Sequence, residues 1–194
     1  MATMILLPDG SSGHTTHWVD YPATTHQDAL DDDNGDTSYV RTTSDGRYLN
    51  ITYADPSVAE GDIASITSVR FLSSGRSTDR SNPALVDISF LTPTAGFSET
   101  ATYLVHASSY TTINGTSRTT SDGSTAWTYS DLENLSMRMT KNGTEGVRVS
   151  YLALEVTYTE AAAGYGNDVI GIDSGDISKI NGIATADISK VNGI

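Results

Sequence analysis

The chain contains no cysteine and is poor in proline, aromatic residues and positive charge. Its 194 residues include 5 Pro and 8% aromatic residues, and 11 Lys and Arg stand against 24 Asp and Glu, so the formal net charge is −13. Without cysteine the protein can form neither disulfide bonds nor a thiolate metal site. A surface this acidic repels phosphate, which argues against binding to DNA or RNA.

Long apolar runs are also missing. No segment approaches the roughly 20 apolar residues that a membrane-spanning helix needs. The opening "MATMILLPDG" lacks the basic start and the longer apolar stretch of a signal peptide. We therefore expect no membrane association and no secretion signal. The length favours one domain with an appendage.

Thr, Ser and Gly are abundant, and they separate short apolar or β-branched runs with turn signals such as "SDG", "SSG" and "KNG". No run before residue 160 keeps an apolar period of 3.6, so helices are not expected as the main elements. The pattern predicts about ten strands, near residues 3–7, 38–43, 47–53, 66–73, 84–91, 101–107, 109–113, 117–121, 135–140 and 146–158.

The last of these strands, "GVRVSYLALEVTYT", has the clearest alternation. One face is predicted to carry Leu152, Leu154, Val156 and Tyr158, and the other Val149, Tyr151, Ala153 and Glu155. Many short strands predict an all-β fold: an antiparallel two-sheet β-sandwich of jelly-roll type over residues 1–158. A closed barrel fits less well because the turn signals are unevenly spaced.

One helical turn is predicted in "TYSDLENL", residues 128–135. Ser130 and Glu133 have the spacing of a capping box, in which each side chain accepts a hydrogen bond from the backbone of the other. We therefore expect this turn to begin at Ser130.

The composition changes at residues 159–168, where small residues and glycines predict a linker. Beyond it, residues 169–194 repeat "VIGI", "INGI" and "VNGI" every 11 residues. One such unit buries too little apolar surface to be stable alone, so copies must stack or pair between chains. A disordered acidic tail is the competing interpretation. The predicted assembly residues are Val169, Gly171, Ile172, Ile180, Gly182, Ile183, Val191, Gly193 and Ile194.

Three stretches carry a family resemblance. "ILLPDGSSGHTTHW" joins a strand, a Pro-Asp-Gly turn and a Thr/Ser-rich stretch that leads to a Trp, and "ALDDDNGDTSYVRT" puts a run of Asp before a Tyr-containing strand. "AWTYSDLENLSMRM" places a Trp and a short helix ahead of the long final strand. Together they resemble the small jelly-roll structural proteins of tailed bacteriophages, and "DISKINGI" is similar to the "VNGV"-type repeats that end many phage structural proteins.

The resemblance implies a non-enzymatic virion protein, assembled in the host cytoplasm as an outward-facing head decoration or a head or tail appendage. Its partners would be other virion proteins of the capsid or tail, and no cofactor is expected. A homo-oligomer is predicted. A trimer is favoured, because three chains could each contribute one copy of every Gly-Ile pair and so close a core without an open edge. The alternative function is a carbohydrate-binding adhesion module of tail-fibre or receptor-binding type that takes a host glycan.

Histidines and aspartates gather early in the chain, at His14, His17, His26, Asp28, Asp31, Asp32 and Asp33. The surrounding loop formers favour unliganded histidines over a zinc site. "DDDNGD" fails the EF-hand spacing, because with Gly35 in sixth place the twelfth place is Arg41, where an acid is required. A solvated acidic turn is favoured over a looser calcium site, so we predict no metal.

Signals of catalysis are weak. The chain has no "GxSxG" elbow, no Gly-rich phosphate loop and no basic run. His106 lies in an apolar strand, where a core or edge position is favoured over a catalytic base. No acidic pair stands in a setting that would separate two pKa values, so hydrolysis of a polysaccharide ranks behind binding.

Aromatic residues near expected loops are the better candidates for contact with a sugar. They are Trp18, Trp127 and Tyr129, together with Tyr110. For the two tryptophans, a place covering the edges and ends of the core is favoured over a place in a glycan site.

Overall fold

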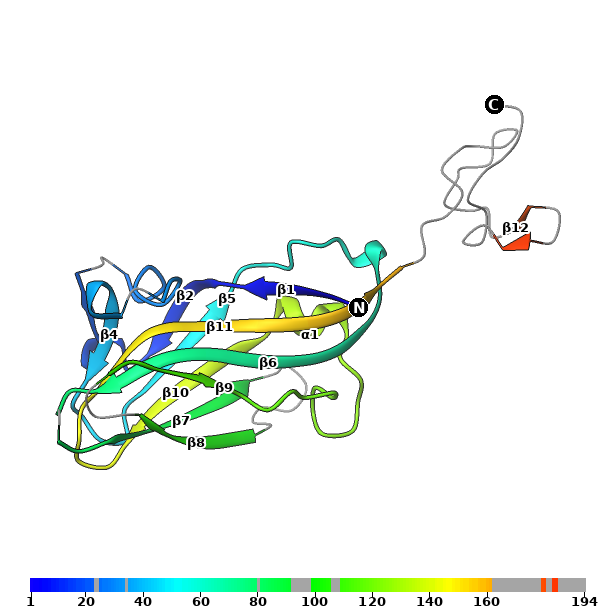
Figure 1. Ribbon diagram of the computed structural model, residues 1–194. Helices are drawn as coiled ribbons and strands as arrows, with labels where there is room; N and C mark the ends of the chain where they lie inside the picture. Colours follow the sequence, from blue (N-terminus) through cyan, green and yellow to red (C-terminus); the bar gives the residue numbers. More distant parts are fainter. Residues whose placement is uncertain are drawn as a thin grey trace.

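The computed structural model shows an all-β protein in which two antiparallel sheets pack face to face (Figure 1). It describes residues 1–22, 25–33, 35–79, 81–91, 99–105, 109–161, 179–180 and 183–184, and for 99–105 and the last two segments the backbone alone. No helix in these ranges has the length and hydropathy that crossing a membrane requires.

Sheet A has the order β3 (Val19–Tyr21), β4 (Tyr39–Thr42), β11 (Val147–Glu160), β6 (Ile63–Ser77) and β9 (Thr111–Asn114), and β1 (Ala2–Leu6) also pairs with β11. Sheet B has the order β2 (Pro8–Gly13), β5 (Tyr48–Tyr53), β10 (Ser136–Asn142), β7 (Ala84–Leu91) and β8 (Glu99–Val105). Short 3₁₀ turns lie at η1 (Thr15–His17), η2 (Gly35–Thr37) and η3 (Glu60–Asp62).

The predicted fold class, an antiparallel two-sheet sandwich of jelly-roll type, is confirmed. Two strands of the sandwich were not predicted, β2 and β3. Both are edge strands, and they are either rich in turn formers or only three residues long. Pro and Gly are tolerated at a sheet edge, where fewer ladder bonds are needed. The strand predicted at 117–121 is wrong: only isolated bridges form there, at Arg118 and Thr120.

The central strand β11 runs two residues beyond the predicted end of the domain and contains a register shift between Val149 and Tyr151. The shared face predicted for Leu152, Leu154, Val156 and Tyr158 is confirmed, since all four belong to the core. Val149 was predicted on the opposite face of the strand, but it is buried in the same core. A bulge inserts one residue and so reverses the side-chain alternation on one side of it.

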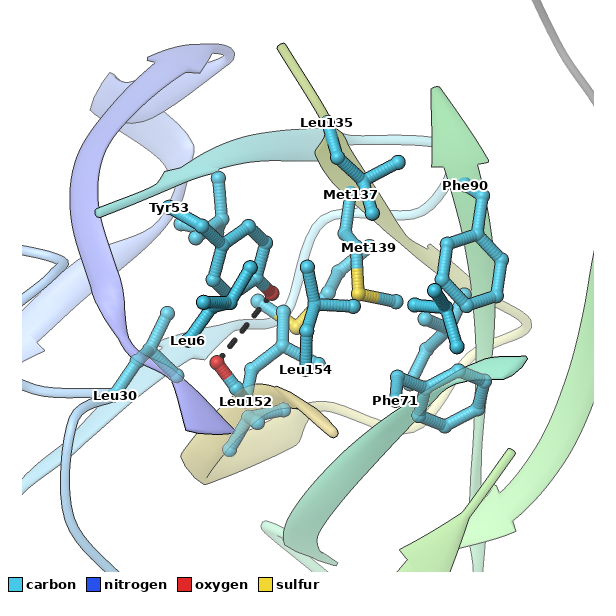
Figure 2. Packing of buried hydrophobic residues seen from close by; sticks show 14 of the residues in the cluster. Leu6, Leu30, Tyr53, Phe71, Phe90, Leu135, Met137, Met139, Leu152 and Leu154 are labelled. Carbon is cyan, nitrogen blue, oxygen red and sulfur yellow. Dashed lines mark hydrogen bonds between the residues drawn. The ribbon is translucent and has the colours of Figure 1, made fainter. Parts of the chain in front are cut away.

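Both sheets contribute to one apolar core (Figure 2). Leu154 of β11 lies among side chains from the opposite sheet, including Met137 and Met139 of β10. The Tyr53 hydroxyl, also buried there, donates to the Leu152 carbonyl at 3.4 Å. Burial raises the pKa of this phenol well above its usual value, so the core holds a neutral tyrosine.

The helical turn predicted in residues 128–135 is present as α1 (Tyr129–Glu133), but its cap differs. Thr128 is the N-cap: its hydroxyl accepts from the Asp131 backbone N–H at 3.1 Å, and the Asp131 carboxylate accepts from the Thr128 N–H at 2.9 Å. Trp127 before the cap and Leu132 at the fourth helical position are both in the core, in the places of a hydrophobic staple.

Most of the predicted linker and assembly tail lies outside the described residues, including Val169, Gly171, Ile172, Gly182, Val191, Gly193 and Ile194. Within the tail, β12 (Lys179–Ile180) pairs with β13 (Ile183–Ala184), and Ile180 stands directly opposite Ile183. Ile180 therefore lies in a short strand, and its partner Ile183 follows the "NG" turn signal in the sequence. The division of the chain at residues 158 and 168 stays a prediction.

Candidate functional site

Three arginines line up across sheet A. Arg148 of β11 is the register partner of Arg41 in β4 on one side and of Arg76 in β6 on the other. Directly opposed residues of antiparallel strands project from the same face of a sheet. The neighbours Val40, Val147 and Val149 are buried, so the arginines stand on the outer face. We call Arg41, Arg148 and Arg76 the arginine row.

Asp36, in η2, is the counter-ion of this row. Its Oδ1 accepts from Arg76 Nη2 at 2.7 Å and from Arg148 Nη1 at 2.7 Å, and the Tyr110 hydroxyl lies 3.5 Å away. The hydrogen bond from Arg76, and then that from Arg148, lower the pKa of the Asp36 carboxyl. Asp36 comes from the predicted acidic turn, which is therefore tied to the sheet at this residue.

Tyrosine rings flank the row. The Arg148 guanidinium lies 4.6 Å from the centroid of Tyr39, and that ring stacks on Tyr21 at 5.1 Å. Tyr110 lies under Arg76 at 5.5 Å. Burial, and then the Asp36 charge, raise the pKa of Tyr110 to about 12, so its hydroxyl stays protonated and can donate. Tyr21 is 51% exposed, which leaves an open aromatic edge beside the row.

An open cavity of about 330 Å³ lies at the β3–β4–β11 end of the row. Its size falls at the lower end of the range for small-molecule sites, about 300–1,000 Å³. It is lined by Arg41, Arg148, Val19, His17 and the threonines 42, 43 and 78. The lining thus combines two cations, several hydroxyl groups, an imidazole and one apolar side chain.

The two cavity arginines differ in how they are held. Arg41 is exposed, and its guanidinium has no carboxylate partner in the described part of the chain. Arg148 is fixed through Nη1 by Asp36, but its Nε is buried and has no acceptor among the described residues. A buried donor without an acceptor costs about 1–3 kcal/mol, so its presence at this position calls for a physical explanation.

Gly146, just before β11, lies close to two threonines of the cavity lining. A Cβ built there would lie 2.5 Å from Thr78 Oγ1 and 3.0 Å from the Thr43 methyl group. Both threonines line the cavity. The site therefore depends on a small residue at the start of β11, since a larger side chain would push Thr43 and Thr78 out of place.

The structure separates the aromatic residues predicted to stack on sugars. Trp18 is 1% exposed and belongs to the core, and Trp127 is 5% exposed with its Nε1 donating to the Arg118 carbonyl. Neither indole offers an open face to a ligand in this structure, because both belong to the buried core, which is the place that the sequence favoured for them. Trp127 and Tyr129 share a cavity of about 180 Å³, below the usual size of a ligand site.

The predicted cluster of histidines and aspartates is also dispersed. His26 Nε2 bonds the Trp18 carbonyl at 2.9 Å, and its Nδ1 is 3.5 Å from Asp20. His14 packs on the Tyr48 ring and accepts from the Tyr48 N–H at 3.3 Å, while His17 lines the 330 Å³ cavity. Among the described residues no three His, Asp or Glu side chains could share a metal ion. His106 lies outside those residues.

The outer face of sheet B offers a useful contrast. There Arg138 lies 4.1 Å from the Tyr48 ring centroid, its Nε donates to Asn50 Oδ1 at 2.8 Å, and Asn142 donates to Asp87. These polar groups satisfy one another. In the arginine row, in contrast, the described residues give Arg41 no carboxylate partner and Arg148 Nε no acceptor, so the cavity beside the row is the stronger candidate.

The arginine row was missed by sequence analysis, which found no basic run. Successive members of the row lie 35 and 72 positions apart in the sequence, in "YVRT", "SGRS" and "VRVS". A cation inside an alternating apolar strand does signal an outward position. Only the pairing register brings the three side chains together, and register could not be predicted from the separate strands.

Comparison with protein-family models and with curated proteins finds no match. Among solved structures, a truncated AlyQ with CBM32 and alginate lyase domains aligns with a TM-score of 0.44 and 13% identity over 84% of this chain, which spans 35% of that one. The CBM22-1 xylan-binding domain of Paenibacillus barcinonensis Xyn10C aligns with a TM-score of 0.39 and 12% identity, over 79% of this chain and 97% of that one.

A family 16 carbohydrate-binding module aligns with a TM-score of 0.39 and 11% identity, over 71% of this chain and 84% of that one. At these values the likenesses add nothing to the sandwich architecture already seen in the strand pairing. The resemblance to phage virion proteins is not tested by them and stays a prediction.

Proposed function

We propose that this protein is a non-catalytic carbohydrate-binding module that acts in adhesion. The observation that carries the proposal is the 330 Å³ cavity of sheet A, which is lined by two arginines and three threonines and has an exposed tyrosine beside it. A sugar presents hydroxyl groups around its rim and an apolar C–H face. Threonine and arginine side chains match the first, and an aromatic ring or Val19 matches the second.

Binding fits this cavity better than hydrolysis does. Glycoside cleavage commonly uses two carboxyl groups on opposite sides of the scissile bond, about 5–10 Å apart. None of the described residues that line the cavity is Asp or Glu. Asp36 is near, but Arg76 and Arg148 hold it as a carboxylate, which is unsuited to donate a proton.

The virion role predicted from the sequence is compatible with this proposal, because an adhesion module of a phage particle is both a structural protein and a glycan binder. In that setting the sandwich would meet the host glycan, and the repeats after residue 168 would join the module to its own copies or to other virion proteins. The proposal for the sandwich stands independently of the particle.

The proposal can be tested with a glycan array followed by titration calorimetry of the saccharides retained. We expect wild-type protein to bind at least one saccharide class, and Thr43→Trp to abolish binding by covering the cavity from an exposed position. Thr116→Trp, an equally exposed change in the loop after β9, is the matched control. Absence of binding across the array, or full binding by Thr43→Trp, would contradict the proposal.

A further inference from the structure

We propose that the cavity on sheet A selects an acidic saccharide, whose carboxylate or sulfate group is held between the guanidinium groups of Arg41 and Arg148. This inference rests on the carbohydrate-binding function proposed above and adds the chemical class of the ligand.

The arginine row is positively charged, whereas the protein as a whole is strongly negative. The formal net charge is −13, yet three of the 11 basic residues stand side by side in one register row. Like charges directly opposed across strands destabilise a sheet. Asp36 is the carboxylate that contacts Arg76 and Arg148, so the row keeps a local excess of positive charge at Arg41. An anionic ligand would offset this repulsion.

The free donors point to the same chemistry. Arg41 is exposed and lines the cavity, and no described carboxylate pairs with it. Arg148 also lines the cavity, but its Nε is buried, so it contributes its charge and the exposed part of its guanidinium group. Arg148 is also pre-positioned, because Asp36 holds its Nη1 and Tyr39 lies against its plane. Two planar guanidinium groups, one of them fixed, suit the paired oxygens of a carboxylate or sulfate, which accept charge-assisted hydrogen bonds.

The rest of the lining indicates that the anion belongs to a sugar. A bare ion would leave most of the 330 Å³ unfilled, and the threonines and Val19 would have no counterpart. A nucleic acid would bring many phosphates against an acidic surface. A saccharide with one acidic group per ring meets the arginines with its charge and the threonines with its hydroxyl groups.

The test compares polymers that differ only in charge. Calorimetry would use polygalacturonate and its carboxyl-reduced form, and a sulfated galactan with its desulfated form. We expect at least one acidic polymer to bind about tenfold or more tightly than its neutral partner. That binding should weaken with added salt, as exposed charge pairs do.

Substitutions of Arg41 test whether this residue causes the preference for acidic polymers. Arg41→Gln should weaken binding of the acidic polymer about tenfold and leave any binding of the neutral polymer unchanged. Arg41→Lys keeps the positive charge but lacks the planar guanidinium group, so its affinity for the acidic polymer should lie between those of wild type and Arg41→Gln. Arg47→Gln removes a partly exposed arginine before β5 and is the matched control. Thermal melts would confirm that each variant is folded.

The outcomes separate this inference from the proposed function. If acidic and neutral polymers bind equally and Thr43→Trp blocks both, carbohydrate binding stands and the acidic selectivity is overturned. An unchanged affinity of Arg41→Gln for the acidic polymer also overturns it. If no polymer binds, both proposals fall, and binding of inorganic sulfate alone would reduce the cavity to a simple anion site.

Discussion

Leu154 tests the core at the level of one side chain. It is fully buried in β11 between the sheets. Leu154→Ala should lower the free energy of unfolding by about 2–5 kcal/mol, because it removes buried methyl groups and leaves a cavity. Chemical denaturation would measure this loss. Leu85→Ala, at a position 36% exposed in β7, should change stability by less than about 0.5 kcal/mol. A loss below about 1 kcal/mol for Leu154→Ala would contradict its placement.

Asp36 gives a pH-dependent prediction. Its hydrogen bonds to Arg76 and Arg148 lower its pKa below the reference value of 3.8, so its stabilising contribution is complete above that value and is lost as the pH falls through the folded pKa. Asp36→Asn should therefore be less stable than wild type near neutral pH, and the difference should shrink in acid. The Asp36 side chain is 61% exposed, so we expect about 1 kcal/mol or less.

Urea denaturation at several pH values would measure the Asp36 effect. Asp45→Asn removes the same charge from an exposed turn residue and is the control. A stability gap for Asp36→Asn that does not change with pH would mean that its ion pairs do not contribute. Added salt should also narrow the gap at neutral pH, since these charges are partly screened by solvent.

Single residues also show where sequence reasoning ends. The burial of Leu152, Leu154 and Val156 follows from alternation and could be predicted. The core position of Trp18 was the favoured prediction, although alternation does not require it, and the role of Arg41 could not be predicted. An aromatic residue near a loop either covers the core or faces solvent, and the choice depends on packing from distant segments. A lone arginine in a strand acquires its partners only through the pairing register.

At the scale of the element, α1 separates two capping schemes. Sequence spacing favours Ser130 and Glu133, whereas Thr128 and Asp131 make the reciprocal bonds. Thr128→Ala should destabilise the protein by about 0.5–2 kcal/mol, the usual cost of losing an N-cap side chain. Ser130→Ala should cost less than about 0.5 kcal/mol. Thermal or urea denaturation of the two variants would measure these losses. A larger loss of stability for Ser130→Ala than for Thr128→Ala would favour the cap at Ser130.

Strand β11 shows why the elements were predictable and their register was not. Its length and its inner face follow from a period of two over many residues. The bulge near Ser150 has no comparable local signal, yet it turns Val149 inward beside Val147. The same shift leaves Arg148 pointing outward between Arg41 and Arg76. The candidate site therefore depends on the bulge in β11, which the periodicity of the sequence does not predict.

For the whole molecule, the sandwich and the repeats after residue 168 make separate contributions. All the residues of the core cluster lie between Met4 of β1 and Tyr158 of β11. We therefore expect the sandwich to fold without residues 164–194. Carbohydrate binding at the cavity should also survive the truncation, because all the residues that line it lie between His17 and Arg148.

The tail should instead determine assembly. Ile172, Ile183 and Ile194 recur every 11 residues, each after a glycine, and apolar side chains at that spacing gain from burial against a partner or another copy. The pairing of Ile180 with Ile183 shows one such unit presenting a short strand, an element suited to addition of further strands. Deleting residues 164–194 should therefore leave a soluble, folded sandwich with a lower mass by light scattering.

Substitution can separate this effect from the loss of chain length. Ile183→Asp with Ile194→Asp should reproduce the truncation, because an unpaired charge cannot be buried at those positions. The control pair, Ile183→Val with Ile194→Val, keeps the apolar character and should assemble like wild type. A trimer is the expected assembly, since three copies of each Gly-Ile step can enclose one another without leaving an open edge. If light scattering gives the mass of a monomer for both the full-length and the truncated protein, the repeats do not drive self-association. Attachment to another protein would then be the role to test.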